Sequence, residues 1–166
     1  IGLEPHNWVT AWVAITDSNE HNGCMRMWSG SHKDNLKKHN QMFNEGNLLT
    51  RGQTVNNVPI KKTTPLILDA GQMSLHHPTV VHGSDLNKSN DRRIGFVIQS
   101  YIGTNVKQVL GKNGVQLARG KDNYNFHETI ERPKSLMDKN DIKIKKQEND
   151  NLQEIFYKGS SKKGNY

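Results

Sequence analysis

A polar stretch with the sequence HGSDLNKSNDRR, residues 82–93, contains the side chains of this chain that are best suited to chemistry. His82 supplies an imidazole, a common metal ligand, and Ser84 supplies a hydroxyl. Arg93 supplies a permanently charged guanidinium whose fork matches a carboxylate. If these side chains share one space, they can hold a metal ion and a carboxylate-bearing ligand together. The alternative for Arg93 is an exposed ion pair with a neighbouring aspartate, which contributes little.

The elements around this stretch are predicted to bring the three side chains together. Apolar runs at Met73–Val81 and Ile94–Ile102 predict two strands, and the polar residues between them predict a turn near Asn87-Lys88. In such a hairpin the imidazole lies roughly opposite the guanidinium. The hydroxyl shares the face of the imidazole because side chains alternate along a strand.

The first hundred residues otherwise consist of short candidate strands separated by turn signals. Asn22-Gly23 is a strong turn signal and predicts a hairpin between the strands that flank it. Short strands at this spacing, with hardly any helix, indicate an all-β sandwich or jelly roll. The predicted strands are Trp8–Asp17, Cys24–Trp28, Thr64–Asp69 and Met73–His77.

Two regions depart from this pattern. Lys33–Pro59 is rich in Asn, Lys, Gly and Gln without periodicity, which is typical of a functional lid or binding loop, or of a disordered segment. After Gly103 the chain becomes polar, and Pro133–Met137 and Asp141–Tyr157 predict polar helices. We assign packing and solvation to this tail, and no chemistry.

Composition narrows the class of protein. With 166 residues the chain is large enough for one domain with a core, although only 33% of its residues are hydrophobic. A net charge of +7 and a pI near 9.5 are typical of proteins that bind polyanions. The lysines, however, are scattered among Asn, Asp and Glu, and no nucleic-acid module is recognisable. We therefore expect a basic surface that favours anionic substrates, and no nucleic-acid partner.

Cysteine content and hydropathy bear on location. The single cysteine, Cys24, excludes an internal disulfide and indicates a reducing compartment, so we expect a cytoplasmic protein with one inert, buried thiol. No apolar run approaches the roughly twenty residues that a membrane span needs, so we expect no membrane partner. The chain begins with Ile1 rather than Met, and we expect that a true N-terminus is missing.

Two blocks of the sequence resemble the phytanoyl-CoA dioxygenase family, whose members are non-haem iron enzymes dependent on 2-oxoglutarate. The first block is WVAITDSNEHNGCMRMWSGSHK, Trp12–Lys33, and the second is AGQMSLHHPTVVHGSDLNKSNDRRIGFVIQSYI, Ala70–Ile102. Asn22-Gly23 and Gly30-Ser31-His32 match the N-G and P-G-S-H elements of the family, with Ser29 in place of the proline. The blocks occur in the family's order, and the resemblance covers about the first hundred residues.

The resemblance implies a role for each candidate side chain. His82 matches the distal histidine of a 2-His-1-carboxylate Fe(II) site, and neutral imidazole suits Fe(II). Ser84 and Arg93 match the residues that bind the far carboxylate of 2-oxoglutarate. Thr10 and Trp12 share one strand face and resemble positions that line the co-substrate pocket.

The other two iron ligands form an H-x-D motif in the family, which lies a few residues before the position of Ile1. The resemblance therefore implies an N-terminally truncated fragment that lacks this motif and holds one ligand of three. We expect such a fragment to be inactive by itself. Among the remaining histidines, at most one of His76 and His77 faces the cavity, because they alternate faces. His77 and His32 are the further candidates for a substrate-side or supporting role.

The implied fold is mainly β: a double-stranded β-helix, or cupin-like jelly roll, incomplete at its N-terminus and followed by a helical, basic C-terminal extension. Residues 1–103 would form the larger, C-terminal part of the jelly roll and residues 104–166 the extension. The implied enzyme is a dioxygenase that couples oxidative decarboxylation of 2-oxoglutarate to hydroxylation of an unactivated C–H bond of a small organic substrate, using dioxygen. Two alternatives remain open: a halogenase on the same scaffold, in which chloride replaces the ligating carboxylate, and a non-catalytic jelly-roll binding module.

Overall fold

The computed structural model describes residues 2–34, 36–42 and 52–160, and most regular structure in them is antiparallel strand. These residues form two compact units. We call residues 8–40 and 53–102 the sheet unit, and residues 1–7, 41–52 and 103–166 the helical unit.

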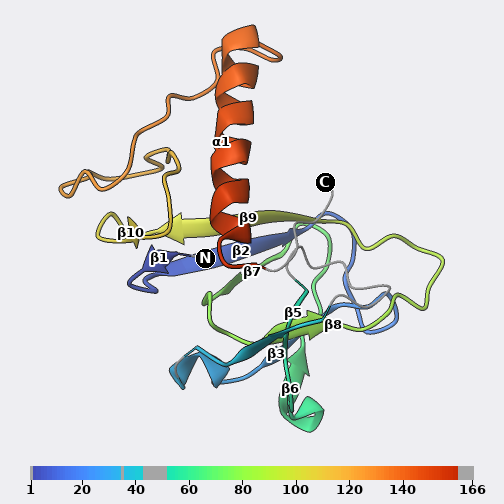
Figure 1. The fold of residues 1–166 in the computed structure, drawn as a ribbon. Helices are drawn as coiled ribbons and strands as arrows, with labels where there is room; N and C mark the ends of the chain where they lie inside the picture. Colours follow the sequence, from blue (N-terminus) through green and yellow to red (C-terminus); the bar gives the residue numbers. More distant parts are fainter. Residues whose placement is uncertain (1, 35, 43–51, 161–166) are drawn as a thin grey trace. The chain divides into compact units, whose positions relative to one another are not determined.

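The first sheet of the sheet unit has β2, Trp8–Ala14, as its central strand. β2 pairs antiparallel with β7, Met73–His76, on one side and with β9, Gly95–Ile102, on the other (Figure 1). Ala11, Trp12 and Ala14 of β2 are buried, as expected for a strand with neighbours on both edges.

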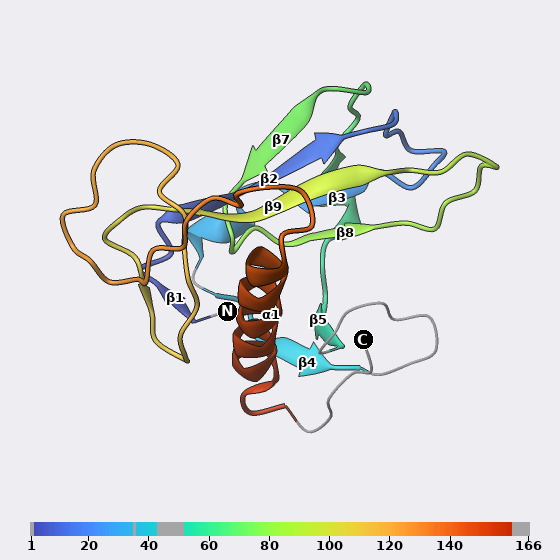
Figure 2. The ribbon, with the colours of Figure 1, turned by 90° about the horizontal axis from the view of Figure 1, so that it is seen from above.

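The second sheet has β3, Met25–Trp28, at its centre, between β6, Thr63–Pro65, and β8, His82–Ser84 (Figure 1). Figure 2 shows β3 and β8 from above. Both pairings are antiparallel. Met27 lies opposite His82, and Met25 lies opposite Ser84, so the two candidate site residues on β8 share a face.

Both predicted hairpins are wrong, although most of their strands exist. β8 belongs to the second sheet and β9 to the first, so the stretch of residues 82–93 connects two sheets instead of turning within one. The same holds for β2 and β3, which flank Asn22-Gly23. A turn signal reverses the chain locally, but partners far along the chain decide which strands pair.

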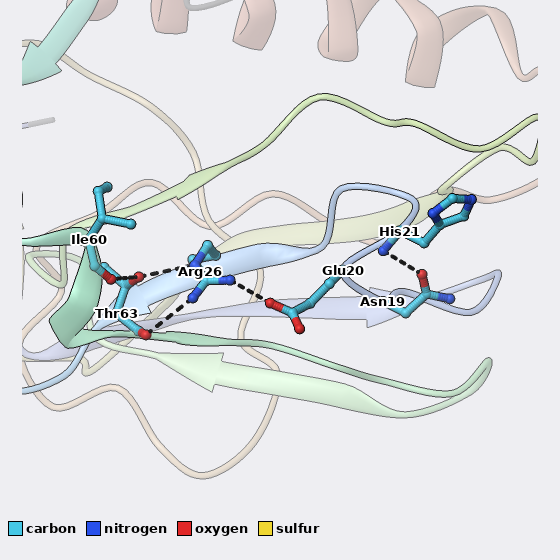
Figure 3. A network of polar contacts seen from close by, with 6 residues as sticks. All are labelled: Asn19, Glu20, His21, Arg26, Ile60 and Thr63. Atoms are coloured by element: carbon cyan, nitrogen blue, oxygen red, sulfur yellow. Dashed lines mark hydrogen bonds and ion pairs between the residues drawn. The ribbon is translucent and has the colours of Figure 1, made fainter.

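Polar contacts hold β3 against β6 on the side away from β8 (Figure 3). The guanidinium of Arg26 donates to Glu20 Oε1 at 2.7 Å and, through Nε, to Thr63 Oγ1 at 3.1 Å. The Thr63 hydroxyl in turn donates to the carbonyl of Ile60 at 2.7 Å. These bonds hold β3 in place, and β8 pairs with β3.

The region predicted to be a lid or binding loop contains short elements where it is described. They are the paired strands β4, His39–Gln41, and β5, Gln53–Val55; the 3-10 helix η1, Ser31–Lys33, ends where the region begins, and the 3-10 helix η2, Ile60–Lys62, directly follows it. Residues 35 and 43–51 of this region lie outside the described residues, so its role stays a prediction.

The helical unit contains β1, Leu3–Glu4, paired with β10, Lys107–Gln108, and the helix α1, Lys139–Tyr157. The predicted helix over Asp141–Tyr157 is confirmed, and its start is explained by Asp138, whose carboxylate accepts hydrogen bonds from two backbone N–H groups of the first turn.

The second predicted helix of the tail, Pro133–Met137, does not form: this segment consists of turns and bends. The core of the helical unit includes Leu3, Val106 and Ile155. No helix in the described part of the chain is long and apolar enough to cross a membrane.

Gly23 allows the chain before β3 to lie directly against the segment that follows β8. Its φ is +75°, a conformation that favours glycine, and a Cβ there would lie 2.6 Å from the carbonyl oxygen of Asp85. In the same place the N–H of Lys88 donates to the carbonyl of His21 at 3.1 Å. The N-G turn therefore fixes the end of β8 that carries Ser84.

We expect Gly23→Ala to destabilise the chain more than Gly71→Ala does. Both glycines have positive φ, which costs about 1–2 kcal/mol for alanine, but a Cβ on Gly71 would have no atom within 4 Å. Gly23→Ala adds the backbone clash, at about 1–3 kcal/mol more. Urea unfolding of both variants measures the difference, and equal losses of unfolding free energy would contradict the proposed contact with Asp85.

Candidate active site

Arg93 links the two sheets of the sheet unit. Its guanidinium lies over the ring of Trp12 on β2, 5.6 Å from the ring centroid, and donates through Nη2 to Ser84 Oγ on β8 at 3.5 Å. Trp12 is buried, and Gly95 leaves the space for its ring on β9, because a Cβ there would collide with the indole. The guanidinium thus has a cation–π contact with the indole and a hydrogen bond to the hydroxyl.

The hydroxyl of Thr16 holds the backbone on both sides of Arg93. Thr16 Oγ1 donates to the carbonyl of Arg92 at 2.9 Å and accepts from the N–H of Ile94 at 2.9 Å. These two bonds hold the residues on either side of Arg93. Arg93 is half-buried, whereas Arg92 is exposed.

His82 has a defined proton position. Its Nδ1 lies 3.0 Å from the carbonyl oxygen of Val80, and a carbonyl can only accept a hydrogen bond. Nδ1 therefore carries the proton in the neutral ring, and Nε2 keeps a lone pair. This is the usual arrangement of a metal-ligating histidine, whose second nitrogen is held by a carbonyl or carboxylate.

The described structure places His76, and not His77, beside His82. The two rings lie 5.4 Å apart between centroids. His76 ends β7 opposite Thr10, whose hydroxyl donates to the carbonyl of Gln99 at 2.7 Å. Burial, and then the nearby charge of His82, lower the pKa of His76, so its imidazole is neutral at pH 7.

His77 and His32 form a second pair. Their ring centroids lie 5.4 Å apart, and His77 Nδ1 contacts the Thr79 hydroxyl at 2.9 Å. The sequence favoured His77 over His76 because neighbouring residues on a strand point to opposite faces, but it could not say which face is the inner one. The cross-strand partner Thr10 was the available signal, since Thr10 was itself a site candidate.

The chain does contain one tripeptide with H-x-D spacing, His32-Lys33-Asp34, which the sequence prediction overlooked. It lies on η1, in the turn after β3 and not at the front of the chain. Asp34 forms an ion pair with Lys37 at 3.0 Å. Within the described residues, no group of three His, Cys, Asp or Glu side chains is arranged to hold a metal ion.

A sequence model of the phytanoyl-CoA dioxygenase (PhyH) family matches residues 3–95, more than half of the chain. The chain belongs to the phytanoyl-CoA dioxygenase family. Fe(II) and 2-oxoglutarate are the cofactors of this family of oxidoreductases, and the resemblance seen in the sequence is thereby confirmed.

Relatives in this family include peroxisomal phytanoyl-CoA dioxygenases of mammals. The mouse protein is 28% identical over 107 residues, which are 64% of this chain and 31% of the mouse protein. The human protein is 30% identical over 86 residues, 51% of this chain and 25% of the human protein. The chain thus spans about a quarter to a third of the length of these curated relatives.

Among solved structures, the fold is similar to that of ThoJ, a non-heme monooxygenase. The apo form superposes with a TM-score of 0.81 at 27% identity, covering 95% of this chain and 56% of ThoJ. The nickel complex of ThoJ gives a TM-score of 0.74 at 26% identity, with 95% and 55% covered. The chain is therefore mainly β with the architecture of a non-haem iron oxygenase.

The described residues provide some of the groups that would bind Fe(II) and 2-oxoglutarate. His82 presents one imidazole with a free Nε2 lone pair, and Arg93 with Ser84 presents donors suited to a carboxylate. A facial iron site needs two further ligands, which do not converge on His82 within the described residues.

Cys24 lies in the same unit but is chemically inert. It is 2% exposed, and burial raises the pKa of its thiol, while a hydrogen bond from the Leu66 backbone acts weakly in the other direction. A neutral, buried thiol is neither a good nucleophile nor a metal ligand. The expectation of a buried cysteine is confirmed.

We expect Cys24 in the folded chain to react with a thiol reagent such as DTNB at least about a hundredfold more slowly than in the urea-unfolded chain at the same pH. The reagent can reach this thiol only when the structure opens. The absorbance of the released thiolate measures both rates. Rapid labelling of the folded chain would show that Cys24 is accessible and that its environment has been misjudged.

Proposed function

We propose that this chain contributes the co-substrate pocket of an Fe(II)- and 2-oxoglutarate-dependent dioxygenase that hydroxylates an unactivated C–H bond of a small organic substrate. The observation that carries the proposal is the guanidinium of Arg93, which lies over the Trp12 ring and is hydrogen-bonded to Ser84. Ser84 is two residues from His82 on one strand face. A fixed cation beside a free imidazole suits a ligand that has a carboxylate at one end and binds a metal ion at the other.

In this proposal the far carboxylate of 2-oxoglutarate accepts hydrogen bonds from Arg93 and Ser84. Trp12 forms an apolar wall that excludes water and strengthens this charge-assisted pairing. Thr10 lines the same face of β2 as Trp12. His82 Nε2 is one metal ligand, and Val80 keeps the proton on the other nitrogen.

The metal site requires two more ligands, and the sheets indicate where they would enter. In the described part of the chain, β8 and β9 are edge strands of their sheets. A further strand beside β8 that carries an H-x-D motif would place both ligands next to His82 and would complete a double-stranded β-helix. We propose that this motif comes from a part of the protein outside these 166 residues.

When bound, Fe(II) and 2-oxoglutarate supply the power to oxidise a C–H bond with dioxygen. The residues of this chain bind and orient the co-substrate, exclude water and hold one imidazole in its metal-binding tautomer. The nickel complex of ThoJ supports a divalent-metal site in this fold. The single free thiol agrees with a reducing compartment such as the cytoplasm.

Arg93→Ala tests the carboxylate site. The variant leaves the far carboxylate without a charged partner in a partly desolvated pocket, which costs about 2–5 kcal/mol. We therefore expect the affinity for 2-oxoglutarate to fall about thirtyfold or more in an N-terminally completed, Fe(II)-loaded protein that includes the H-x-D motif, measured by anaerobic titration. Arg93→Lys should restore only part of it, because an ammonium keeps the charge but not the bidentate fork.

Arg92→Ala is the matched control, since Arg92 precedes Arg93 but is exposed. We expect it to leave 2-oxoglutarate affinity unchanged. If Arg92→Ala is the damaging change and Arg93→Ala is silent, the site assignment fails. If neither change matters, the chain does not use 2-oxoglutarate in the proposed way, and a non-catalytic binding module becomes the better interpretation.

The 166-residue chain by itself should bind Fe(II) weakly, because one imidazole cannot hold the ion against water. Anaerobic titration of the chain and of its His82→Ala variant should give similar, weak isotherms and no turnover of 2-oxoglutarate. Tight binding of one Fe(II) per chain, lost in His82→Ala, would contradict the proposal that the remaining ligands lie outside these residues.

A further inference from the structure

The G-S-H turn after β3 has no role in the proposed function, yet it contains a buried hydroxyl. Ser31 is 1% exposed, and a hydroxyl at such a position needs a hydrogen-bond partner. Its Oγ accepts from the N–H of Val81 at 2.9 Å. The turn thus contacts Val81, which is 50 residues away in the sequence and directly precedes His82.

The peptide between Val80 and Val81 connects Ser31 with the imidazole of His82. Its N–H donates to Ser31 Oγ, and its carbonyl accepts from His82 Nδ1 at 3.0 Å. Because a peptide group is planar, the bond to the N–H also fixes the direction of the carbonyl. The same bond polarises the group, so that its carbonyl is a stronger acceptor.

The next peptide is fixed as well. The carbonyl of Val81 accepts from the N–H of Trp28, at the end of β3, at 2.8 Å. Both polar backbone groups of Val81 are therefore held by β3 and the turn that follows it. Rotation of the peptide before Val81 is opposed by the hydroxyl of Ser31.

We propose that Ser31 is a positioning residue: through the Val80–Val81 peptide, its hydroxyl fixes His82 as the Nδ1–H tautomer and keeps Nε2 free for a metal ion. This inference rests on the proposed function only for the role of the metal. The hydrogen-bonded chain of three groups exists in the metal-free protein and can be tested there.

The test compares Ser31→Ala, which removes the acceptor, with Ser31→Cys, which keeps the volume but accepts weakly. Nitrogen-15 NMR of the metal-free chain at about pH 8 reports the tautomer of each neutral histidine. We expect a single Nδ1–H form of His82 in the parent chain and a mixture of tautomers in both variants. Hydrogen exchange of the Val81 amide should become about tenfold faster.

Ser29→Ala is the control, because Ser29 lies in the same turn but is exposed, and its hydroxyl is hydrogen-bonded to the Thr64 hydroxyl at 3.3 Å and not to the peptide before Val81. We expect it to change neither readout, and the tautomer of His77 to stay the same throughout. An unchanged His82 tautomer in a folded Ser31→Cys or Ser31→Ala variant would overturn the proposal, as would an equal effect of Ser29→Ala.

Failure of the proposed function would look different from failure of this inference. The NMR measurement contains neither iron nor 2-oxoglutarate, so a protein that binds no 2-oxoglutarate can still show the dependence of His82 on Ser31. Conversely, 2-oxoglutarate binding that depends on Arg93, combined with a His82 tautomer that ignores Ser31, would leave the function in place and remove the role of Ser31.

Discussion

The pairing of β3 with β8 is the interaction on which the candidate site depends. β8 has only three residues, so its own ladder specifies register weakly, and a slip by one residue would turn His82 and Ser84 to the other face. Contacts on either side of β3 prevent this. Gly23, before β3, lies against the segment that follows β8. Ser31, after β3, holds the peptide that precedes β8.

The second constraint joins the two sheets through Arg93. Its backbone is held by the hydroxyl of Thr16, next to β2, and its side chain reaches Ser84 on β8. A guanidinium between an indole ring and a hydroxyl is oriented before any ligand arrives, so less conformational entropy remains to be lost on binding. Preorganisation of this kind is what a carboxylate pocket needs.

The sequence predicted local features better than long-range ones. β2, β3, β7 and α1 were expected close to where they lie, because alternation, turn residues and helical composition act over a few residues. Strand pairing was not predictable, since turn signals do not reveal that the strands they join enter different sheets. Arg93, Ser84 and His82 nevertheless lie in one region. The predicted hairpin does not form, but the Arg93 side chain reaches across to Ser84 on β8, the strand that also carries His82. The position of His76 beside His82 was not predicted, because alternation separates His76 from His77 without showing which of the two lies on the side of His82.

We propose that Arg93 and Ser84 bind the far carboxylate of one 2-oxoglutarate molecule, while His82 binds the metal ion at its other end. An anaerobic crystal structure of the Fe(II)-loaded protein with 2-oxoglutarate tests it most directly. The account predicts the far carboxylate in the fork of Arg93, within about 3 Å of the guanidinium and of Ser84 Oγ, and Nε2 of His82 on the metal. A carboxylate bound elsewhere, or a His82 ring turned so that Nδ1 faces the metal, would contradict it.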